Sequence, residues 1–147
     1  MLPVPAVALR IAFGGFASDL LESQDIDFRF RMPPEIESGD ANVVTLGADL
    51  RREIYVIFKE NVNNLVKHSG ASAVEMEIQY EHRHHFGFTI ADNGRGFNVN
   101  DVVEGGSSGM GGNGLPNMRK RAAALGGTFE IFSEPRKGTT VRLKIPL

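Results

Sequence analysis

The sequence predicts an α/β (α+β) two-layer sandwich, in which helices cover one face of a mixed, mostly antiparallel sheet. Two observations support this fold class. Two segments carry the apolar repeat of helices, and two pairs of segments with alternating apolar residues are each joined by a short connection. Along the chain the order is strand, long helix, hairpin, glycine-rich loop, helix and hairpin. This order is typical of helices packed on a largely antiparallel sheet.

Composition limits the classes of function. The chain has 147 residues, of which 41% are hydrophobic and ten are Phe, enough for the core of one domain. Sixteen Lys and Arg against eighteen Asp and Glu give a net charge of −2, so no global field attracts nucleic acid or an anionic membrane. The absence of Cys excludes disulfides, thiolate catalysis and Cys-based zinc sites, and it is compatible with a reducing cytosol.

The N-terminal segment is apolar but has neither the length of a membrane span nor the pattern of a signal peptide. Residues 1–16 include two prolines and Arg10 and are shorter than the roughly 20 residues of a span. We interpret them as a packed segment or as the cut edge of a longer chain. Residues 19–32 then predict a short helix followed by a strand, because apolar and charged residues alternate from Ile26 to Met32.

A long helix is predicted from Asp49, as N-cap, to about His68, with Gly70 as its stop. Six apolar residues share one arc and form the predicted core face: Ile54, Tyr55, Phe58, Val62, Leu65 and Val66. Three polar residues share the opposite side: Glu60, Asn64 and Lys67. Three further polar residues flank them: Asn61, Asn63 and His68.

Two interpretations of this polar face remain open. One is a solvated surface with neighbours at i,i+3 and i,i+4. The other is a ligand site, because three Asn within four positions are poor helix formers whose side chains compete for backbone hydrogen bonds. The amide oxygen of Asn64 suits Mg²⁺, and Glu60, one turn earlier, could polarise a water or hydroxyl nucleophile.

Two hairpins are predicted. Residues 72–81 and 85–92 are joined by the sequence HRHH, and residues 128–134 and 138–147 by the sequence PRKG. We interpret the His cluster as a solvated turn and not as a metal site, because no carboxylate or second cluster is placed to complete the ligation.

Six glycines lie between Gly105 and Gly114, immediately before a helix that carries Pro116 near its first turn and stops at Gly126 and Gly127. Such a loop can bring backbone N–H groups close to phosphate oxygens, at a helix end that favours negative charge. A flexible surface linker is the alternative that the loop leaves open.

The sequence DNGRGF follows the apolar strand that ends near residue 92. Asn-Gly after a strand is a strong turn signal, so a simple turn is one interpretation. Gly94 and Gly96, however, remove side chains beside Asp92, so that a flat ring could approach its carboxylate. Adenine offers an exocyclic amine to such an acceptor, whereas guanine presents a carbonyl oxygen there.

The order of four motifs along the chain is more specific than any one of them: ENVNNLVKH, DNGRGF, GGNGLPNMRKRAAALGG and KGTTVRLKIP. This order resembles the ATP-binding catalytic domain of sensor histidine kinases, in the superfamily shared with gyrase-type ATPases, heat-shock chaperones and mismatch-repair ATPases. The subgroup it resembles is that of nitrate-sensor and lipid-fluidity-sensor kinases. The resemblance covers residues 48–147 well and residues 1–47 only in general pattern, and it implies one Bergerat-type ATP-binding domain over residues 1–147.

The resemblance implies roles for residues of the first motif and the cofactors ATP and Mg²⁺. Asn64 would be the Mg²⁺ ligand, and Glu60 would stand at the general-base position of the related ATPases. Lys67 and His68 would face the phosphates.

The resemblance also implies a nucleotide site in the later motifs. Asp92 would accept a hydrogen bond from the adenine amine, and Thr139 would support it directly or through water. Gly94 and Gly96 would shape the pocket, and Phe97 would mark where the pocket gives way to an ATP lid at residues 98–110. Backbone N–H groups around the phosphates would come from three further residues: Gly112, Gly114 and Leu115.

The implied partners follow from phosphoryl transfer. Sensor kinases phosphorylate a His on a helical dimerisation hairpin, and no such helix precedes this domain, so the acceptor would lie on another chain or another part of the parent protein. A response regulator would follow in the pathway, in the cytoplasm. The parent would be a homodimer, a membrane-anchored sensor being compatible with the resemblance, and this fragment would be a monomer. Two alternatives stay open: a serine kinase of the anti-sigma type, and a nucleotide-dependent interaction module without transfer.

Overall fold

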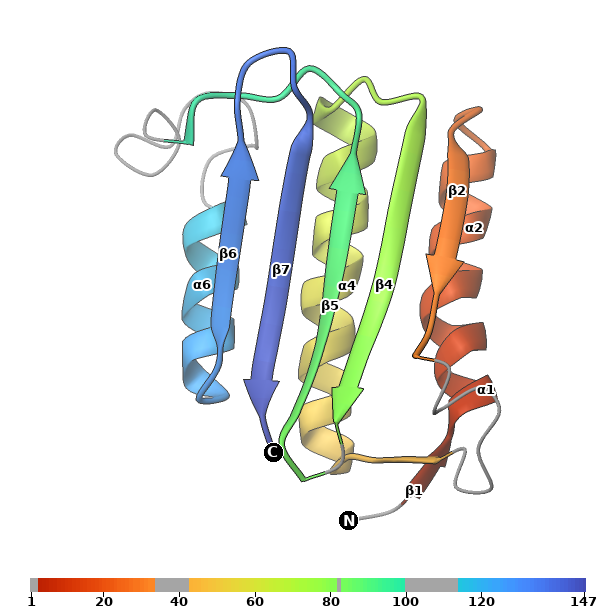
Figure 1. Cartoon of the computed structure of the whole chain (residues 1–147), viewed down its shortest axis with the longest axis vertical. Helices are drawn as coiled ribbons and strands as arrows, with labels where there is room; N and C mark the ends of the chain where they lie inside the picture. The colour runs from red at the N-terminus through yellow and green to blue at the C-terminus, as the bar shows by residue number, and fades with distance from the viewer. Residues whose placement is uncertain (1–2, 34–42, 82, 100–113) are drawn as a thin grey trace.

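The main sheet forms one of the two layers of the molecule. The computed structural model describes residues 3–33, 43–81, 83–99 and 114–147, and within these residues the sheet has five strands in the order β2-β4-β5-β7-β6 (Figure 1). Their bounds are β2 Asp27–Arg31, β4 Ala73–Glu81, β5 His85–Asp92, β6 Thr128–Ser133 and β7 Thr139–Pro146. Strands β2 and β4 are parallel, and the other three pairings are antiparallel. The predicted mixed, mostly antiparallel sheet and its two hairpins are confirmed.

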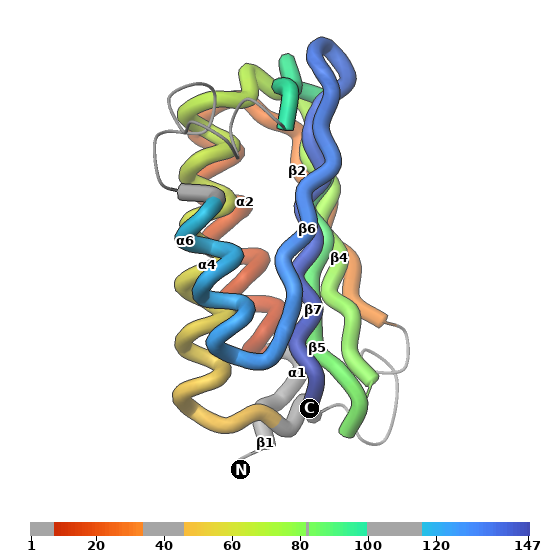
Figure 2. The backbone as a smooth tube through the Cα atoms, turned by 90° about the vertical axis from the view of Figure 1, so that its left-hand side faces the viewer, coloured from red at the N-terminus to blue at the C-terminus, as the bar shows by residue number. Residues whose placement is uncertain are grey.

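Helices form the second layer on one face of this sheet. Figure 2 shows α2 (Gly15–Glu22), α4 (Ala48–His68) and α6 (Gly114–Ala124) side by side against the sheet. An ion pair joins the last two helices, with 3.4 Å between Arg121 Nη1 and Glu53 Oε2. The predicted α/β sandwich with helices on one face is therefore confirmed.

The N-terminal helical region is longer than the sequence pattern predicted. It runs from α1 (Ala6–Leu9) through one stretch of π-helix (η1, Arg10–Gly14) into α2, and a small sheet pairs β1 (Pro3–Pro5) with β3 (Val43–Thr45). Buried apolar residues recur every four positions along this helix: Leu9, Phe13, Ala17 and Leu21. This stripe overrides the weak helix propensity of Gly14 and Gly15 because it buries one face of the helix continuously.

The long helix α4 matches the prediction in length but not in its N-cap. Its N-cap is Gly47, and no side chain of the described residues caps it, so Asp49 instead lies in the first turn, where a carboxylate favours the positive end of the helix dipole. The helix ends at His68, and Gly70, with φ of 63°, takes the chain into the left-handed region.

One residue of α4 lies on a different face from the predicted one. Asn61 was expected to flank the polar side, but it is only 3% exposed and belongs to the buried face. The other buried residues of the helix are Ile54, Ile57, Phe58, Val62 and Leu65. Asn61 follows Ile57 by four positions and precedes Leu65 by four, so both of its helical neighbours face the sheet.

Aromatic rings join the two layers. The Phe13 and Phe58 centroids are 4.7 Å apart in an edge-to-face arrangement, and Phe58 makes a second such contact with Phe88 of β5 at 5.5 Å. Phe58 therefore connects the N-terminal helical region, the long helix and the sheet.

No helix within the described residues combines the length and apolar character needed to cross a membrane.

Truncation of the central ring tests this packing. Phe58→Ala should lower the free energy of unfolding by about 3–5 kcal/mol, because Phe58 is fully buried and its removal leaves a cavity between the layers. Urea unfolding followed by circular dichroism measures the change. Phe132→Ala is the matched control, because Phe132 is 51% exposed, and it should cost less than about 1.5 kcal/mol. Equal costs at the two positions would contradict this assignment of the core.

Candidate functional site

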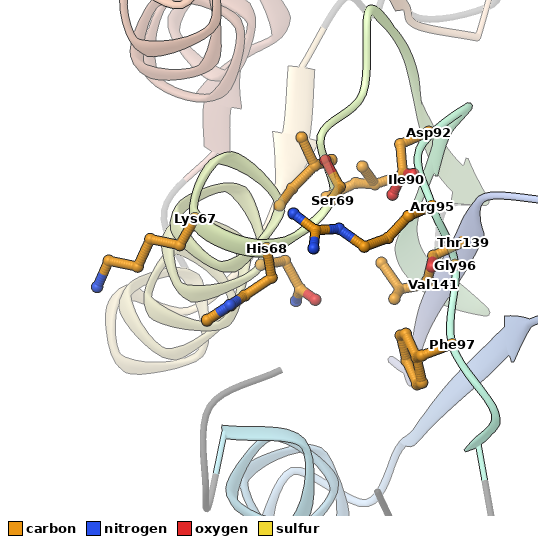
Figure 3. A pocket seen from close by; sticks show the side chains of 12 residues that line it. Lys67, His68, Ser69, Ile90, Asp92, Arg95, Gly96, Phe97, Thr139 and Val141 are labelled. Atoms are coloured by element: carbon orange, nitrogen blue, oxygen red, sulfur yellow. The ribbon is translucent and has the colours of Figure 1, made fainter. Parts of the chain in front are cut away.

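A pocket of about 320 Å³ lies between the C-terminal half of α4 and the adjoining ends of β5 and β7 (Figure 3). Its apolar walls come from four residues: Leu65, Ile90, Phe97 and Val141. Its polar lining comes from Asn61, Lys67, His68, Ser69, Asp92, Arg95 and Thr139, with Gly96 beside them. A cleft of this size that combines apolar walls with converging polar groups is a candidate small-molecule site.

The DNGRGF segment lies against the C-terminal end of α4. The Arg95 N–H donates to the Ser69 carbonyl at 2.8 Å, and a Cβ atom at Gly94 would collide with that same carbonyl. On the other side, the Arg136 N–H donates to the Arg95 carbonyl. Gly96 has a φ of 62°, and a Cβ atom there would collide with the Glu134 carbonyl. Both glycines are therefore required by close backbone approach.

Asn93 holds this segment in place from outside the pocket. Its Oδ1 accepts from the Ser72 N–H at 2.9 Å and from the Ala73 N–H at 3.0 Å, and its Nδ2 donates to Ser72 Oγ at 2.9 Å. The Asn-Gly pair is thus not the turn of a hairpin, because the partners of β5 are β4 and β7. The segment is therefore not a hairpin turn, although the chain bends at Gly94, whose N–H bonds Asp92 Oδ1 across the bend.

The Asp92 carboxylate sits at the end of β5, and Figure 3 shows it beside the pocket on the side away from Lys67. Its Oδ1 accepts from the Gly94 N–H at 2.8 Å. Burial raises the pKa of Asp92 above its ordinary value, while backbone hydrogen bonds from Gly94 and Thr139 lower it. The two N–H groups therefore favour the ionised, acceptor-only form that burial disfavours.

Thr139 lies opposite Asp92 in the β5–β7 ladder and is 8% exposed. Its Oγ1 is 2.8 Å from Ser133 Oγ, which also accepts from the Phe97 N–H at 2.9 Å and donates to the Gly138 carbonyl at 3.0 Å. Because Ser133 has one hydroxyl proton and gives it to Gly138, the Thr139 hydroxyl donates to Ser133. Thr139 Oγ1 then keeps acceptor capacity toward the pocket.

Half of the residues predicted from the sequence come together around this pocket. Six of them line it: Lys67, His68, Asp92, Gly96, Phe97 and Thr139. Figure 3 shows Lys67 extending away from the side where Asp92 lies, so it stands at the rim. Gly94 lies directly behind the Asp92 carboxylate, as the backbone contact above describes.

The remaining predicted residues are not part of the pocket lining. Glu60 is exposed on α4, and Asn64 is half-buried with an Nδ2 that is buried and has no hydrogen-bond partner within the described chain. Gly114 and Leu115 are the first two residues of α6. Gly112 and most of the expected lid at residues 98–110 lie outside the described residues.

Six lining residues were not predicted as site residues: the apolar Leu65, Ile90 and Val141, and the polar Asn61, Ser69 and Arg95. For Asn61 a signal was present, since it stands between Ile57 and Leu65 at helical spacing. Its Nδ2 donates to the Ile57 carbonyl at 2.9 Å, whereas its buried Oδ1 finds no donor among the residues that the structure describes. A buried acceptor without a donor costs about 1–3 kcal/mol.

The metal alternative for the His connection finds no support in the described part of the chain, where no group of three or more His, Cys, Asp or Glu could hold a metal ion. His84 and His85 instead lie near Glu81, with nitrogen–oxygen distances of 3.9 and 3.7 Å. The connection is the turn between β4 and β5, as predicted.

The chemistry of the pocket suits a flat ring that carries an amine. Asp92 and Thr139 supply acceptors at its base, and aliphatic side chains of Leu65, Ile90 and Val141 supply apolar walls. A ring with a carbonyl group at the same place would set an acceptor against acceptors, with no proton to form a hydrogen bond between them.

Curated relatives share much of this chain. Sensor protein VraS from Staphylococcus saprophyticus is 32% identical over 122 residues, which are 83% of this chain and 33% of that protein. This chain therefore spans about a third of the length of the curated relatives it matches.

Two solved structures share the fold. The histidine kinase domain of the blue-light activated histidine kinase from Erythrobacter litoralis EL346 has a TM-score of 0.69 at 18% identity, covering 92% of this chain and 59% of that one. Histidine kinase AdeS from Acinetobacter baumannii has a TM-score of 0.69 at 17% identity, covering 99% of this chain and 66% of that one.

A family model matches residues 49–147, and this stretch contains α4, the DNGRGF segment and the start of β7, which together form the pocket. The chain belongs to the histidine kinase-, DNA gyrase B-, and HSP90-like ATPase family.

Proposed function

We propose that this domain binds Mg²⁺-ATP and donates the γ-phosphate to a histidine on a separate helical dimerisation domain in two-component signalling. The observation that carries the proposal is the base of the pocket, where Asp92 and Thr139 present acceptors beside an apolar slot. An adenine amine satisfies the Asp92 carboxylate, which a purine carbonyl cannot, and Thr139 supports this contact directly or through water. The family match and the sensor kinase relative support the kinase reading.

The phosphates would extend from the base toward the end of the pocket that His68 lines. In Figure 3 His68 lies between α4 and α6, well separated from Asp92. The first turn of α6, with Gly114 and Leu115, offers backbone N–H groups and the positive end of a helix dipole. Gly112 and the lid at residues 98–110 would complete this phosphate end.

The donor set fits a magnesium ion held mainly by phosphates and water. Asn64 is half-buried on α4, and its side chain carries an amide oxygen, the kind of hard ligand that Mg²⁺ takes. Mg²⁺ accepts one or two protein oxygens together with substrate phosphates, and Asn64 would supply one of them. When bound, the ion would neutralise charge on the transferring phosphoryl group, while Glu60 and Lys67 flank the transfer path.

The acceptor histidine would come from outside residues 1–147, because the described His residues lie in α4 and in the β4–β5 turn. Transfer would then depend on bringing the partner helix to the open phosphate end, with positioning and charge neutralisation supplying most of the rate. A homodimeric parent protein, a response regulator as the next phosphate acceptor and a cytoplasmic site, where ATP is available, belong to the same proposal.

Removal of the base carboxylate tests adenine recognition. Asp92→Asn should weaken ATP binding by about 10- to 100-fold, because a charge-assisted acceptor is replaced by an amide whose NH₂ opposes the adenine amine. Isothermal calorimetry measures the affinity. Asp25→Asn is the matched control, since Asp25 is exposed in the turn after α2 and outside the pocket lining. Unchanged ATP affinity in Asp92→Asn would remove the proposed adenine contact.

The proposed metal ligand has its own test. Asn64→Asp should lower the rate of phosphotransfer at saturating ATP by at least about tenfold, because an added negative charge repels the γ-phosphate. It should also shift the Mg²⁺ dependence of this rate, because a neutral ligand of the ion becomes a charged one. Asn63→Asp, on the exposed side of the same turn, is the control. A rate that keeps the same Mg²⁺ dependence would count against Asn64 as ligand.

Transfer itself requires an added acceptor. With radiolabelled ATP, the isolated chain should label itself little, and label should pass to a separately produced helical domain that carries an acceptor histidine. The label should be lost in acid and kept in alkali, as expected of phosphohistidine. Acid-stable label would indicate a serine kinase instead. Tight ATP binding with no label on any acceptor would indicate an interaction module, and strong self-labelling would contradict the need for a partner.

A further inference from the structure

Asn61 is the polar member of the buried face of α4. It is 3% exposed, as little as the core residue Leu9, and its helical neighbours Ile57 and Leu65 are 0% and 5% exposed. An apolar side chain would fill this position without burying hydrogen-bonding atoms. The position therefore carries a polar group where packing alone does not call for one.

The orientation of the Asn61 amide follows from its hydrogen bond. Its Nδ2 donates to the Ile57 carbonyl at 2.9 Å, which fixes the NH₂ group along the helix. The Oδ1 atom is then the free end, and it is buried without a donor anywhere in the described residues. Buried polar atoms in native proteins nearly always have a partner, so an unpaired one in a binding pocket indicates a missing donor.

The missing donor belongs to the pocket, because Asn61 lines it together with Asp92 and Thr139. Asp92 already accepts from two backbone N–H groups, and Thr139 gives its proton to Ser133. Asn61 Oδ1 is thus a further acceptor in the lining, beside Asp92 and Thr139. The donors of the same lining are Lys67, His68, Ser69 and Arg95, and none of them bonds Asn61 Oδ1.

We propose that Asn61 Oδ1 accepts the second N–H of the adenine amine, directly or through one buried water, and is a specificity-determining residue of the pocket; this inference rests on the proposed function. An exocyclic amine has two N–H groups, and one carboxylate oxygen binds only one of them. With Asp92 on the first and Asn61 on the second, both amine protons are bound. A 6-oxo purine brings an acceptor to this place and gives neither Asp92 nor Asn61 Oδ1 the N–H of an exocyclic amine.

Discrimination between ATP and inosine triphosphate measures this role. Asn61→Leu keeps the number of side-chain heavy atoms and removes the acceptor, and it should weaken ATP binding about 3- to 10-fold while leaving inosine triphosphate binding unchanged or tighter. Asn61→Ala removes the acceptor without adding bulk. Like Asn61→Leu, it should lower the dissociation constant of inosine triphosphate relative to that of ATP. The matched control is Asn63→Leu, on the exposed side of the helix, where the ratio should not change.

Unfolding of the nucleotide-free protein separates a binding role from a structural one. Asn61→Leu should keep or raise the urea midpoint, because it removes a buried acceptor that has no donor. Added ATP should raise the midpoint of Asn61→Leu by less than it raises the midpoint of the unchanged protein. A lower midpoint together with an unchanged nucleotide ratio would show that Asn61 only packs the core.

The same experiments distinguish this inference from the function on which it rests. If Asp92→Asn loses ATP binding but both Asn61 variants keep the ATP affinity and the nucleotide ratio, only the role of Asn61 is overturned. If the unchanged protein does not bind ATP, the proposed function and this inference both fail. Loss of discrimination in Asn61→Leu and Asn61→Ala, with Asn63→Leu unchanged, supports the inference.

Discussion

The antiparallel ladder between β5 and β7 places Asp92 opposite Thr139 and Ile90 opposite Val141. These two pairs bring residues nearly fifty positions apart in the sequence to one side of the sheet, where they form the base and a wall of the pocket. The site depends on this register, because a shift of one residue would turn every side chain of the strand to the opposite face of the sheet. The buried Phe88 and Leu143, also opposite one another, hold the register through the hydrophobic core.

The second side of the pocket depends on how α4 ends. Ser69 offers its carbonyl to the Arg95 N–H, and the same carbonyl lies so near Gly94 that no side chain fits there. Asn93 adds three hydrogen bonds to the start of β4. The segment that presents Asp92 is thus attached to the helix on one flank and to the β6–β7 turn on the other, so the carboxylate is oriented before any ligand arrives.

Much of this architecture could be predicted from the sequence because local patterns determine it. The apolar repeat of α4, the alternation in β2, β4, β5, β6 and β7, and the Gly126 stop of α6 all follow from period and turn chemistry. The extension of the N-terminal helix to Ala6 was missed because Gly14 and Gly15 interrupt its helix propensity, whereas the stripe from Leu9 to Leu21 decides the outcome.

Within the pocket, Asp92 was predictable from the two glycines that follow it, but Ile90 and Val141 depend on strand pairing, which the sequence does not state. Asn61 was assigned to the polar side because its side chain is polar. The strand β2 has β4 as its one neighbour among the described strands, and it lies before residue 49, where the family match begins. Arg29 Nη1 and Arg31 Nη2 lie 4.0 and 3.6 Å from Glu75 Oε1 of β4. Charged side chains therefore gather near this edge of the sheet. A free strand edge otherwise invites pairing with another chain, and charged side chains on β2 disfavour such pairing at this edge of the sheet.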